Sequence, residues 1–542
     1  MSQAALLQET ESLLQYSEPR EYSNESTAPD IRDAATTIPT KDFSDTRRQQ
    51  LGLLNAVSLI FNRIIGTGVF AAPSVILKSS GSVGLTFVMW IIGALVSAAG
   101  TAVYVEFGTG LPRNGGEKTY LEYIYRRPAF LMSCVYASYG ILLGQVPAAS
   151  VAFGGYVLHA LGCEQTAVHV RTVACLCIIL CLFVHGVFPT IGIKLQDTLG
   201  VFKLAVLLLI SASGLFSLVG MPGFSVGEVY DQPRNFGWTT FWEGSSMSAN
   251  AFTNGVYLVI WSFIGYSNAN YALSEVRNPI QTIQRAAPLA MLLVTTVYVL
   301  VNIAYYAVVS KGDILESGTI AAALFFRNLF GPATERVLSA VIGLSILGNI
   351  LAVLFSQGRV NQELGREGIL PCSQLLASNE PFDAPLFGLF IQSLVSILTI
   401  LLTPAGDAYT FVVNFTSYPL ALFNLLTSGG LLLLYTRPYK PYDWNPPFRA
   451  PKYVVIFFFL SNVFLVVVPI IPPSRGYEVY EHLPYYSHVV MAMAIGLAGV
   501  LYWFLCFEWL PRRSGHRLQQ DVITEANGRT RQVFRRIPVH SE

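Results

Sequence analysis

The hydrophobic pattern of the chain consists of long apolar runs separated by short polar segments. Most runs reach about 20 residues, which is enough for a helix to cross a bilayer. Within the runs the apolar residues follow neither the spacing of an amphipathic helix nor the alternation of a β-barrel strand. The pattern therefore predicts helices surrounded by lipid or by one another. Twelve spans are predicted, at residues 51–77, 83–108, 129–160, 172–190, 197–220, 253–274, 284–310, 333–357, 384–404, 408–435, 453–473 and 486–510.

Polar tails flank these spans. Residues 1–50 are rich in Ser, Thr and Glu and lack the apolar segment of a signal peptide, so they are predicted to be disordered. Residues 511–542 form a second polar tail. Lys and Arg concentrate in the loops on the same side of the spans as the tails, which predicts that both termini are cytosolic.

Composition and charge exclude several classes of function. The 542 residues are 53% hydrophobic and only 12% charged, whereas soluble domains are about one quarter charged. A formal net charge of +1 gives no basic bias for binding nucleic acid. Cys175, Cys177 and Cys181 lie in an apolar run without suitably spaced His, Asp or Glu, and are interpreted as buried thiols. The spans carry no HExxH motif or His/Asp cluster, so neither an enzyme, a metal site nor a cofactor is expected.

Two spans carry glycine near the middle of the membrane. Gly66-Thr67-Gly68 lies at the centre of the first span, and the sixth contains Gly265 within the polar stretch 263–268. A glycine weakens a helix by about 1 kcal/mol. Gly-interrupted spans at corresponding places in two halves are typical of inverted-repeat transporters. A packing patch of small residues is the alternative for the first span.

A broken helix offers a recognisable kind of binding site. It exposes N–H groups where its second half begins and C=O groups where its first half ends. Two such breaks side by side can bind an anion and a cation carried on neighbouring atoms. An α-amino acid has this arrangement, so the pattern favours a transporter of a zwitterion.

Several segments of the chain resemble a known family. They are IIGTGVFAAPSVIL, Glu106-Phe107-Gly108 with LPRNGGEKTYLEYIY, IGIKLQDTLGVFKL, SNANYALSEVRNP and SQGRVNQELGREGILP. In this order they resemble the L-type amino acid transporter branch of the amino acid–polyamine–organocation superfamily. Within that branch, FNRIIGTGVF and WSFIGYSNANYALSEV are most similar to the fungal high-affinity methionine permeases.

The resemblance implies a fold and a division into domains. The fold is an all-α polytopic membrane protein with 12 transmembrane helices and a 5+5 inverted repeat (LeuT-like), in which helices 1 and 6 are broken. Residues 51–435 would form the ten-helix transport core, and residues 436–510 would add helices 11 and 12.

The resemblance also implies groups that bind the substrate. The carboxylate is assigned to the backbone N–H groups of the first break, with the Thr67 hydroxyl as a further donor. The ammonium is assigned to carbonyls at the break in each of spans 1 and 6, where the first half of the helix ends. Trp261 is the expected aromatic gate, with Phe263 as its rival, and two polar residues line the substrate or hold the unwound loop. The residues so assigned are Ile64, Ile65, Gly66, Thr67, Gly68, Trp261, Ser262, Phe263, Ile264, Gly265, Ser267 and Asn270.

Charged residues in the spans are candidates for coupling and gating, because burying a charge in a membrane is costly. The resemblance implies that Lys203 lies beside the first break, where its ammonium would replace the cation of sodium-coupled relatives. Lys203 is also a candidate carrier of the coupled proton. Arg63 either closes an inner gate with Glu275 or Asp197 or extends to the inner interface. Glu106 is a further candidate. Asn349 and Asn414 are interpreted as contacts between helices.

The sequence thus favours proton-coupled uptake of a neutral L-amino acid, methionine above all, by alternating access at the plasma membrane. Leucine fits nearly as well, because one methylene is worth only about 1–3 kcal/mol. An exchanger, a broader neutral amino acid permease and a nutrient-sensing receptor with a transporter fold are the alternatives. The expected partners are a small-molecule amino acid, protons and the lipid bilayer. Lys41 is a candidate ubiquitin acceptor for ubiquitin-ligase adaptors.

Overall fold

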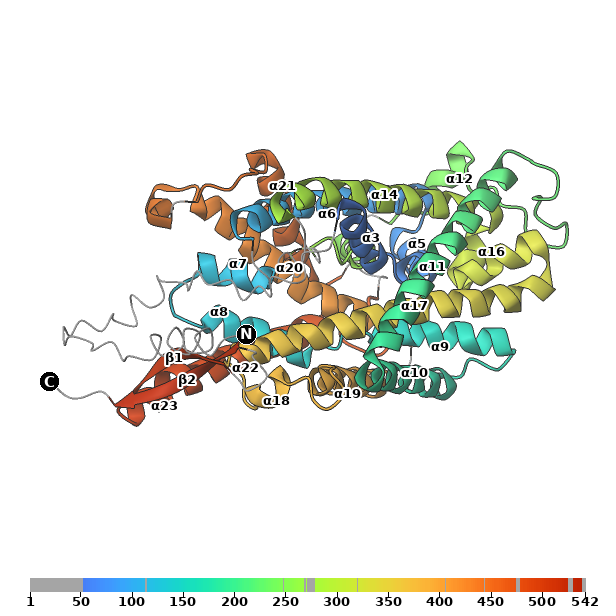
Figure 1. Ribbon diagram of the computed structural model, residues 1–542. Coiled ribbons are helices and arrows are strands. Elements are labelled where there is room, and N and C mark those ends of the chain that lie inside the picture. The colour runs from blue at the N-terminus through green and yellow to red at the C-terminus, as the bar shows by residue number, and fades with distance from the viewer. Residues whose placement is uncertain are drawn as a thin grey trace, which may run out of the picture. The chain divides into compact units, whose positions relative to one another are not determined.

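In the computed structural model the described residues are 52–112, 115–246, 248–267, 270, 278–318, 320–404, 406–442, 444–473, 478–524 and 530–538. Most of them are helical, and one two-stranded sheet follows the last helix (Figure 1). The elements are α3 (Leu53–Ile64), α4 (Gly68–Ala71), α5 (Pro73–Ser80), α6 (Val83–Gly110), α7 (Glu117–Ile124), α8 (Leu131–Leu142), α9 (Pro147–Leu161), α10 (Ala167–Val187), α11 (Pro189–Leu218), α12 (Trp238–Trp242), α13 (Ala249–Ser262), α14 (Pro279–Val308), α15 (Lys311–Glu316), α16 (Ala321–Phe330), α17 (Pro332–Arg366), α18 (Ser373–Ala377), α19 (Leu386–Leu402), α20 (Ala408–Leu434), η3 (Arg437–Tyr442), α21 (Lys452–Val467), η4 (Val468–Ile470), α22 (Ser487–Trp503), η5 (Phe504–Trp509), α23 (Leu510–Arg513), β1 (His516–Thr524) and β2 (Thr530–Pro538).

The long helices agree with a membrane protein that crosses the bilayer many times. Among the described residues, nine helices are long and apolar enough to span it. A bent pair, Ala56–Ala71 with Pro73–Ser80, makes a tenth candidate with an angle of 63°. The 17-residue apolar helix α19 lies at the ninth predicted span, and α13 lies at the sixth. The polytopic helical fold is confirmed, whereas the count of twelve and the inverted repeat stay predictions, as do the predictions for residues 1–50, which lie outside the described residues.

The third predicted span differs from the sequence expectation of one continuous helix. α8 ends at Leu142 and α9 begins at Pro147. A proline has no N–H to donate and its ring clashes with the carbonyl four residues earlier, so a helix cannot run through it without a kink. The apolar run continues through this point, which is why hydropathy alone does not reveal the interruption.

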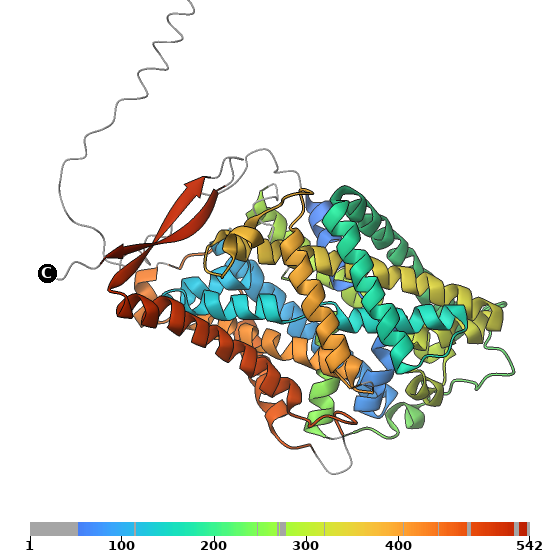
Figure 2. The same cartoon turned by 90° about the horizontal axis from the view of Figure 1, so that it is seen from below.

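The polar C-terminal tail contains a β-hairpin that the all-α description leaves out. β1 and β2 pair antiparallel in the register His516↔Pro538 to Thr524↔Thr530, beside the last helix (Figure 2). Both segments are too polar to stand out by hydropathy. The Phe534 ring packs at 5.2 Å from each of the rings of Phe130 and Phe507, so this part of the tail is anchored to the helical bundle.

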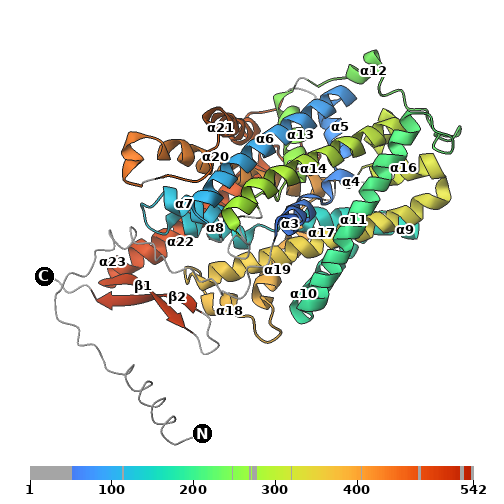
Figure 3. The ribbon, with the colours of Figure 1, turned by 45° about the horizontal axis from the view of Figure 1, so that its top comes forward.

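Several helices pack around the region of α3 and α4. α14 packs against α3, α4 and α6, α13 packs against α6 and α4, and the long helix α17 packs against α3 (Figure 3). These contacts bring the first and sixth predicted spans together in the interior of the bundle.

A chain of buried polar side chains joins four helices and one loop. Asn254 of α13 donates to the Ser79 hydroxyl of α5 at 3.1 Å and accepts from Asn414 of α20 at 2.8 Å. Asn414 also donates to the Tyr480 hydroxyl at 3.0 Å, and that hydroxyl lies 2.9 Å from Nδ1 of His488 in α22. The interpretation of Asn414 as a contact between helices is therefore confirmed.

An ion pair fastens the short helix α7 to the end of α17. The Lys118 ammonium lies 2.5 Å from Glu367 and 2.8 Å from Glu122. Lys118 is 7% exposed. Burial raises the pKa of the Glu367 carboxyl above its ordinary value, although the Lys118 ammonium acts in the opposite direction. Removing one partner of such a pair leaves the other charge buried without compensation.

We therefore expect Lys118→Met to destabilise the protein by about 3 kcal/mol, because the Glu367 carboxylate then loses its buried partner. The midpoint of thermal unfolding in detergent measures this loss. The double variant Lys118→Met, Glu367→Leu is expected to recover most of it. A double variant that unfolds at a lower temperature than Lys118→Met would contradict this account of the ion pair.

Candidate functional site

The first predicted break lies between α3 and α4. α3 ends at Ile64, Ile65 has an extended backbone with φ −70° and ψ 101°, and α4 begins at Gly68. Glycine at positions 66 and 68 weakens the helix by about 1 kcal/mol each. The C=O groups that end α3 and the N–H groups that begin α4 therefore have no partners within their own helices.

The second predicted break follows α13. This helix ends at Ser262, and residues 263–267 form turns. Gly265 has a φ of +127°, a conformation that glycine adopts without the steric penalty of a Cβ atom. The sixth span is therefore interrupted where the sequence predicts. Of the residues from 268 to 277, only Asn270 is described.

The two breaks contact each other through their glycines. A Cβ atom on Gly68 would lie 2.1 Å from Oγ of Ser262. A Cβ atom on Gly265 would lie 2.8 Å from Cγ of Arg63 and 3.2 Å from the backbone nitrogen of Ile64. Neither space admits a side chain, so the absence of a Cβ atom lets the two main chains approach. The predicted juxtaposition of the breaks is thus present in the structure.

Polar groups with unused hydrogen-bonding capacity lie at the first break. Thr67 is 1% exposed, and its hydroxyl has no partner in the part of the chain that the structure describes. Gly66 lies against the carboxamide of Asn349 in α17, since a Cβ atom on it would be 2.8 Å from Oδ1. The N–H of Gly66 faces the hydroxyl oxygen of Tyr298. The sequence interpretation of Asn349 as a contact between helices did not anticipate that its amide borders the break.

Lys203 of α11 lies at the C-terminal end of α3, as expected. Its ammonium donates to the carbonyl of Asn62 at 3.2 Å and to the carbonyl of Ile65. Lys203 is 2% exposed. A positive charge is favourable at this end of a helix, where free carbonyls carry partial negative charge.

Two other carbonyls of the predicted ammonium site accept hydrogen bonds from Tyr298 of α14. The acceptors are the carbonyls of Ile64, at 3.1 Å, and of Ser262, at 2.7 Å. Each carbonyl oxygen has two lone pairs, so each can accept a further donor. Sequence reasoning missed Tyr298, because a single tyrosine in an apolar span has the same pattern as one that only fills space.

The other predicted residues of the sixth span lie around the second break. Trp261 is partly exposed, and its ring meets that of Tyr409 edge-on at 6.0 Å. Phe263 is 1% exposed. Ile264 is partly buried, Ser267 is buried, and Asn270 is 1% exposed with an Oδ1 that has no partner among the described residues.

The charged gating candidates occupy different places. The aliphatic part of Arg63 packs against Gly265 at the second break, whereas Glu275, its predicted partner, lies outside the described residues. Glu106 is fully buried at the end of α6. Its carboxylate accepts from the hydroxyl of Tyr435, from Nε1 of Trp444 at 3.1 Å and from the backbone N–H of Ala450 at 2.8 Å. Any gating by Glu106 would therefore act through segment 435–450.

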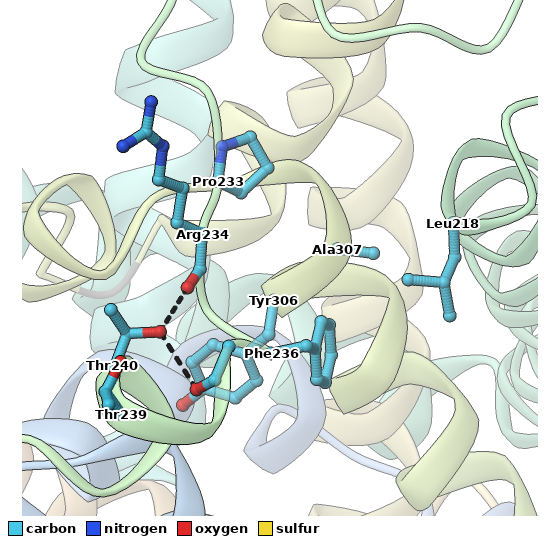
Figure 4. A pocket seen from close by; sticks show the side chains of 9 residues that line it. Leu218, Pro233, Arg234, Phe236, Thr239, Thr240, Tyr306 and Ala307 are labelled. Carbon is cyan, nitrogen blue, oxygen red and sulfur yellow. Dashed lines mark hydrogen bonds between the residues drawn. The ribbon is translucent and has the colours of Figure 1, made fainter.

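A cavity of about 470 Å³ lies elsewhere, between residues 233–240, which include the start of α12, and the ends of α11 and α14. Its lining includes Leu218, Phe236 and Tyr306, and the Thr240 hydroxyl is held there by backbone carbonyls (Figure 4). None of its lining residues belongs to either break. The described residues contain no group of three or more His, Cys, Asp or Glu side chains arranged to hold a metal ion.

Comparison with known proteins shows the family to which the chain belongs. The amino acid permease family matches residues 51–495. The chain is 43% identical over 484 residues to the high-affinity methionine permease of Saccharomyces cerevisiae, and the aligned region covers 89% of this chain and 83% of that protein. It is 31% identical over 478 residues to the low-affinity methionine permease of the same yeast, covering 88% and 85%. It is 28% identical over 495 residues to the b(0,+)-type amino acid transporter 1 of Mus musculus, covering 89% and 93%. The chain therefore belongs to the amino acid permease family, within the amino acid–polyamine–organocation superfamily.

Proposed function

We propose that this protein takes up a neutral L-amino acid, preferentially methionine, by alternating access with proton coupling. The contact between the two broken helices carries the proposal, because it gathers helix-start N–H groups, helix-end carbonyls and a buried hydroxyl that has no partner in the described part of the chain. An α-amino acid complements both kinds of group. The similarity to the yeast methionine permeases supports methionine as the preferred substrate.

The substrate carboxylate binds at the start of α4. The N–H groups of Gly66, Thr67 and Gly68 and the Thr67 hydroxyl are its donors, with the partial positive charge of the helix start in support. The ammonium binds the carbonyls that end α3 and α13, including those of Ile65 and Ile264. The buried Thr67 hydroxyl, which no described residue satisfies, supports this assignment, because an unsatisfied buried hydroxyl costs free energy that a bound carboxylate would recover.

The substrate side chain lies among apolar residues of the sixth span. A thioether is soft and apolar and suits a pocket of Ile, Phe and Trp. Trp261 acts as the gate that closes over it, and its partial exposure at the end of α13 supports this role over that of the buried Phe263. Ser267 and Asn270 line the substrate or hold the unwound segment.

Lys203 stabilises the first break and carries the coupled proton. Its ammonium supplies a fixed positive charge to the carbonyls of Asn62 and Ile65. A lysine can release its proton, whereas an arginine stays charged. Proton release from Lys203 would loosen the end of α3, which links protonation to the opening of the site.

The protein works at the plasma membrane with both termini in the cytosol. The distribution of Lys and Arg in the loops supports this orientation. Arg63 with Glu275, and Glu106 with its segment, control the inner side. Lys41 in the N-terminal tail is the proposed attachment site for ubiquitin, through ubiquitin-ligase adaptors.

Cells that lack their own methionine uptake and express this protein are expected to accumulate labelled methionine, more strongly at acidic than at neutral external pH. Competition by unlabelled leucine and other neutral amino acids measures the breadth of the substrate range. The absence of methionine accumulation with normal surface abundance would overturn the proposed function. If uptake requires an amino acid preloaded inside the cells, the proposed symport mechanism is wrong and the protein is an exchanger.

Replacing Lys203 separates its two proposed roles. Lys203→Met is expected to abolish uptake, because the end of α3 loses its positive charge. Lys203→Arg keeps the charge but cannot release a proton, so methionine should still bind while the dependence of uptake on external pH disappears. Lys194→Met, at an exposed position of the same helix, is the control. Normal pH dependence in Lys203→Arg would exclude Lys203 as the proton carrier.

Gly66→Ala is expected to lower methionine uptake about tenfold, because the added Cβ atom would meet the Asn349 amide and overpacking costs on the order of 1–3 kcal/mol. Adding Asn349→Ala should restore part of the uptake by making room. Gly343→Ala on α17 is the matched control, since its Cβ atom would make only an ordinary contact of 3.6 Å with Val157. Equal uptake in wild type and Gly66→Ala would show that the close approach is not required.

A further inference from the structure

One tyrosine hydroxyl connects the ends of both broken helices. The Tyr298 hydroxyl is 3.1 Å from the carbonyl oxygen of Ile64, the last residue of α3, and 2.7 Å from that of Ser262, the last residue of α13. Both carbonyls belong to final helical turns, where C=O groups lack partners within the helix. A single O–H group thus lies within hydrogen-bond distance of two carbonyls that belong to different helices.

The ring of Tyr298 is held so that its hydroxyl stays between these carbonyls. Tyr298 is fully buried. Its ring makes edge contacts with Trp90 of α6, at 5.3 Å, and with Phe263 at the second break, at 5.1 Å. Trp90 and Phe263 also meet each other edge-on at 6.2 Å. Edge-on aromatic contacts have a preferred geometry, so this cluster sets the direction of the Tyr298 C–O bond.

A neighbour on the same helix shows that a buried tyrosine here does not need such partners. Tyr305 of α14 is 1% exposed, and its hydroxyl has no hydrogen bond with any described residue. A tyrosine that only fills space in α14 is therefore accommodated without two acceptors. Filling space therefore does not explain why the Tyr298 hydroxyl lies between the two helix ends.

We propose that Tyr298 is a positioning residue that sets the distance and direction of the two carbonyl ends on which the substrate α-ammonium binds. This inference rests on the proposed function. The single proton of the Tyr298 hydroxyl is shared between the two carbonyl oxygens, and each oxygen keeps a lone pair for the ammonium. An ammonium has three N–H donors but no fixed direction, so its affinity depends on acceptors that are already oriented. Tyr298 supplies this orientation before the substrate arrives.

The test is Tyr298→Phe, which removes the hydroxyl and keeps the ring. At equal surface abundance, the KM for methionine is expected to rise about tenfold, which corresponds to about 1.4 kcal/mol, while the maximal rate changes less than about twofold. Inhibition by 4-(methylthio)butanoate, which is methionine without its ammonium, should stay unchanged. The preference for methionine over this analogue would therefore shrink.

Tyr305→Phe is the matched control and is expected to keep the wild-type KM. Three results in Tyr298→Phe would overturn the inference: an unchanged KM for methionine, an equal weakening of methionine and analogue, or a lower maximal rate alone. Should Tyr298→Phe not reach the surface, the same two compounds are compared on purified protein by their effect on thermal unfolding. A larger loss of stabilisation by methionine than by the analogue supports the inference, and equal losses overturn it.

The wild-type protein distinguishes this inference from the proposed function. Failure of the wild type to take up methionine would overturn the proposed substrate. Tyr298→Phe is then tested with the amino acid that is taken up and with the analogue of that amino acid that lacks the amino group. Normal wild-type uptake with an unchanged Tyr298→Phe would overturn the role of Tyr298 alone.

Discussion

The structure depends on the close approach of two interrupted helices. Gly68 touches Ser262, and Gly265 touches Ile64, at distances that leave no room for a Cβ atom. Unpaired backbone groups in a membrane are tolerated only where protein or a cavity surrounds them. Each break therefore needs the other, together with the side chains of Lys203 and Tyr298 that saturate part of the exposed carbonyls. The surrounding helices keep this polar centre away from lipid.

The binding groups follow a simple division. The start of α4 offers donors, and the ends of α3 and α13 offer acceptors. Lys203 and Tyr298 approach the acceptor side from α11 and α14, and the Tyr298 hydroxyl oxygen also faces the N–H of Gly66. The Thr67 hydroxyl on the donor side has no partner among the described residues. Lys203 and Tyr298 thus satisfy part of both sides in advance, whereas the Thr67 hydroxyl keeps its hydrogen-bonding capacity with respect to the described residues.

The sequence was sufficient to predict the membrane fold from hydropathy, the positions of both breaks from glycine, and the location of Lys203 from an intramembrane charge. Each of these signals has few interpretations. The sequence was insufficient for Tyr298 and Asn349, since their roles arise from neighbours more than 30 residues away in the chain. Hydropathy also passed over the interruption before Pro147, and the C-terminal hairpin was too polar to be noticed. Local sequence patterns indicate where a helix is interrupted. They do not indicate which distant side chains contact the interruption.

The buried polar chain from Ser79 to His488 gives the final helices a mechanical role. α22 is connected through Tyr480 and Asn414 to α13, and through Asn254 to α5. α5 follows the break in the first span, and α13 precedes the break in the sixth. These hydrogen bonds tie the position of either portion to that of α22, whose apolar surface is mostly left uncovered by the rest of the described protein. A contact that shifts α22 would therefore act on both interrupted spans through the same series of hydrogen bonds.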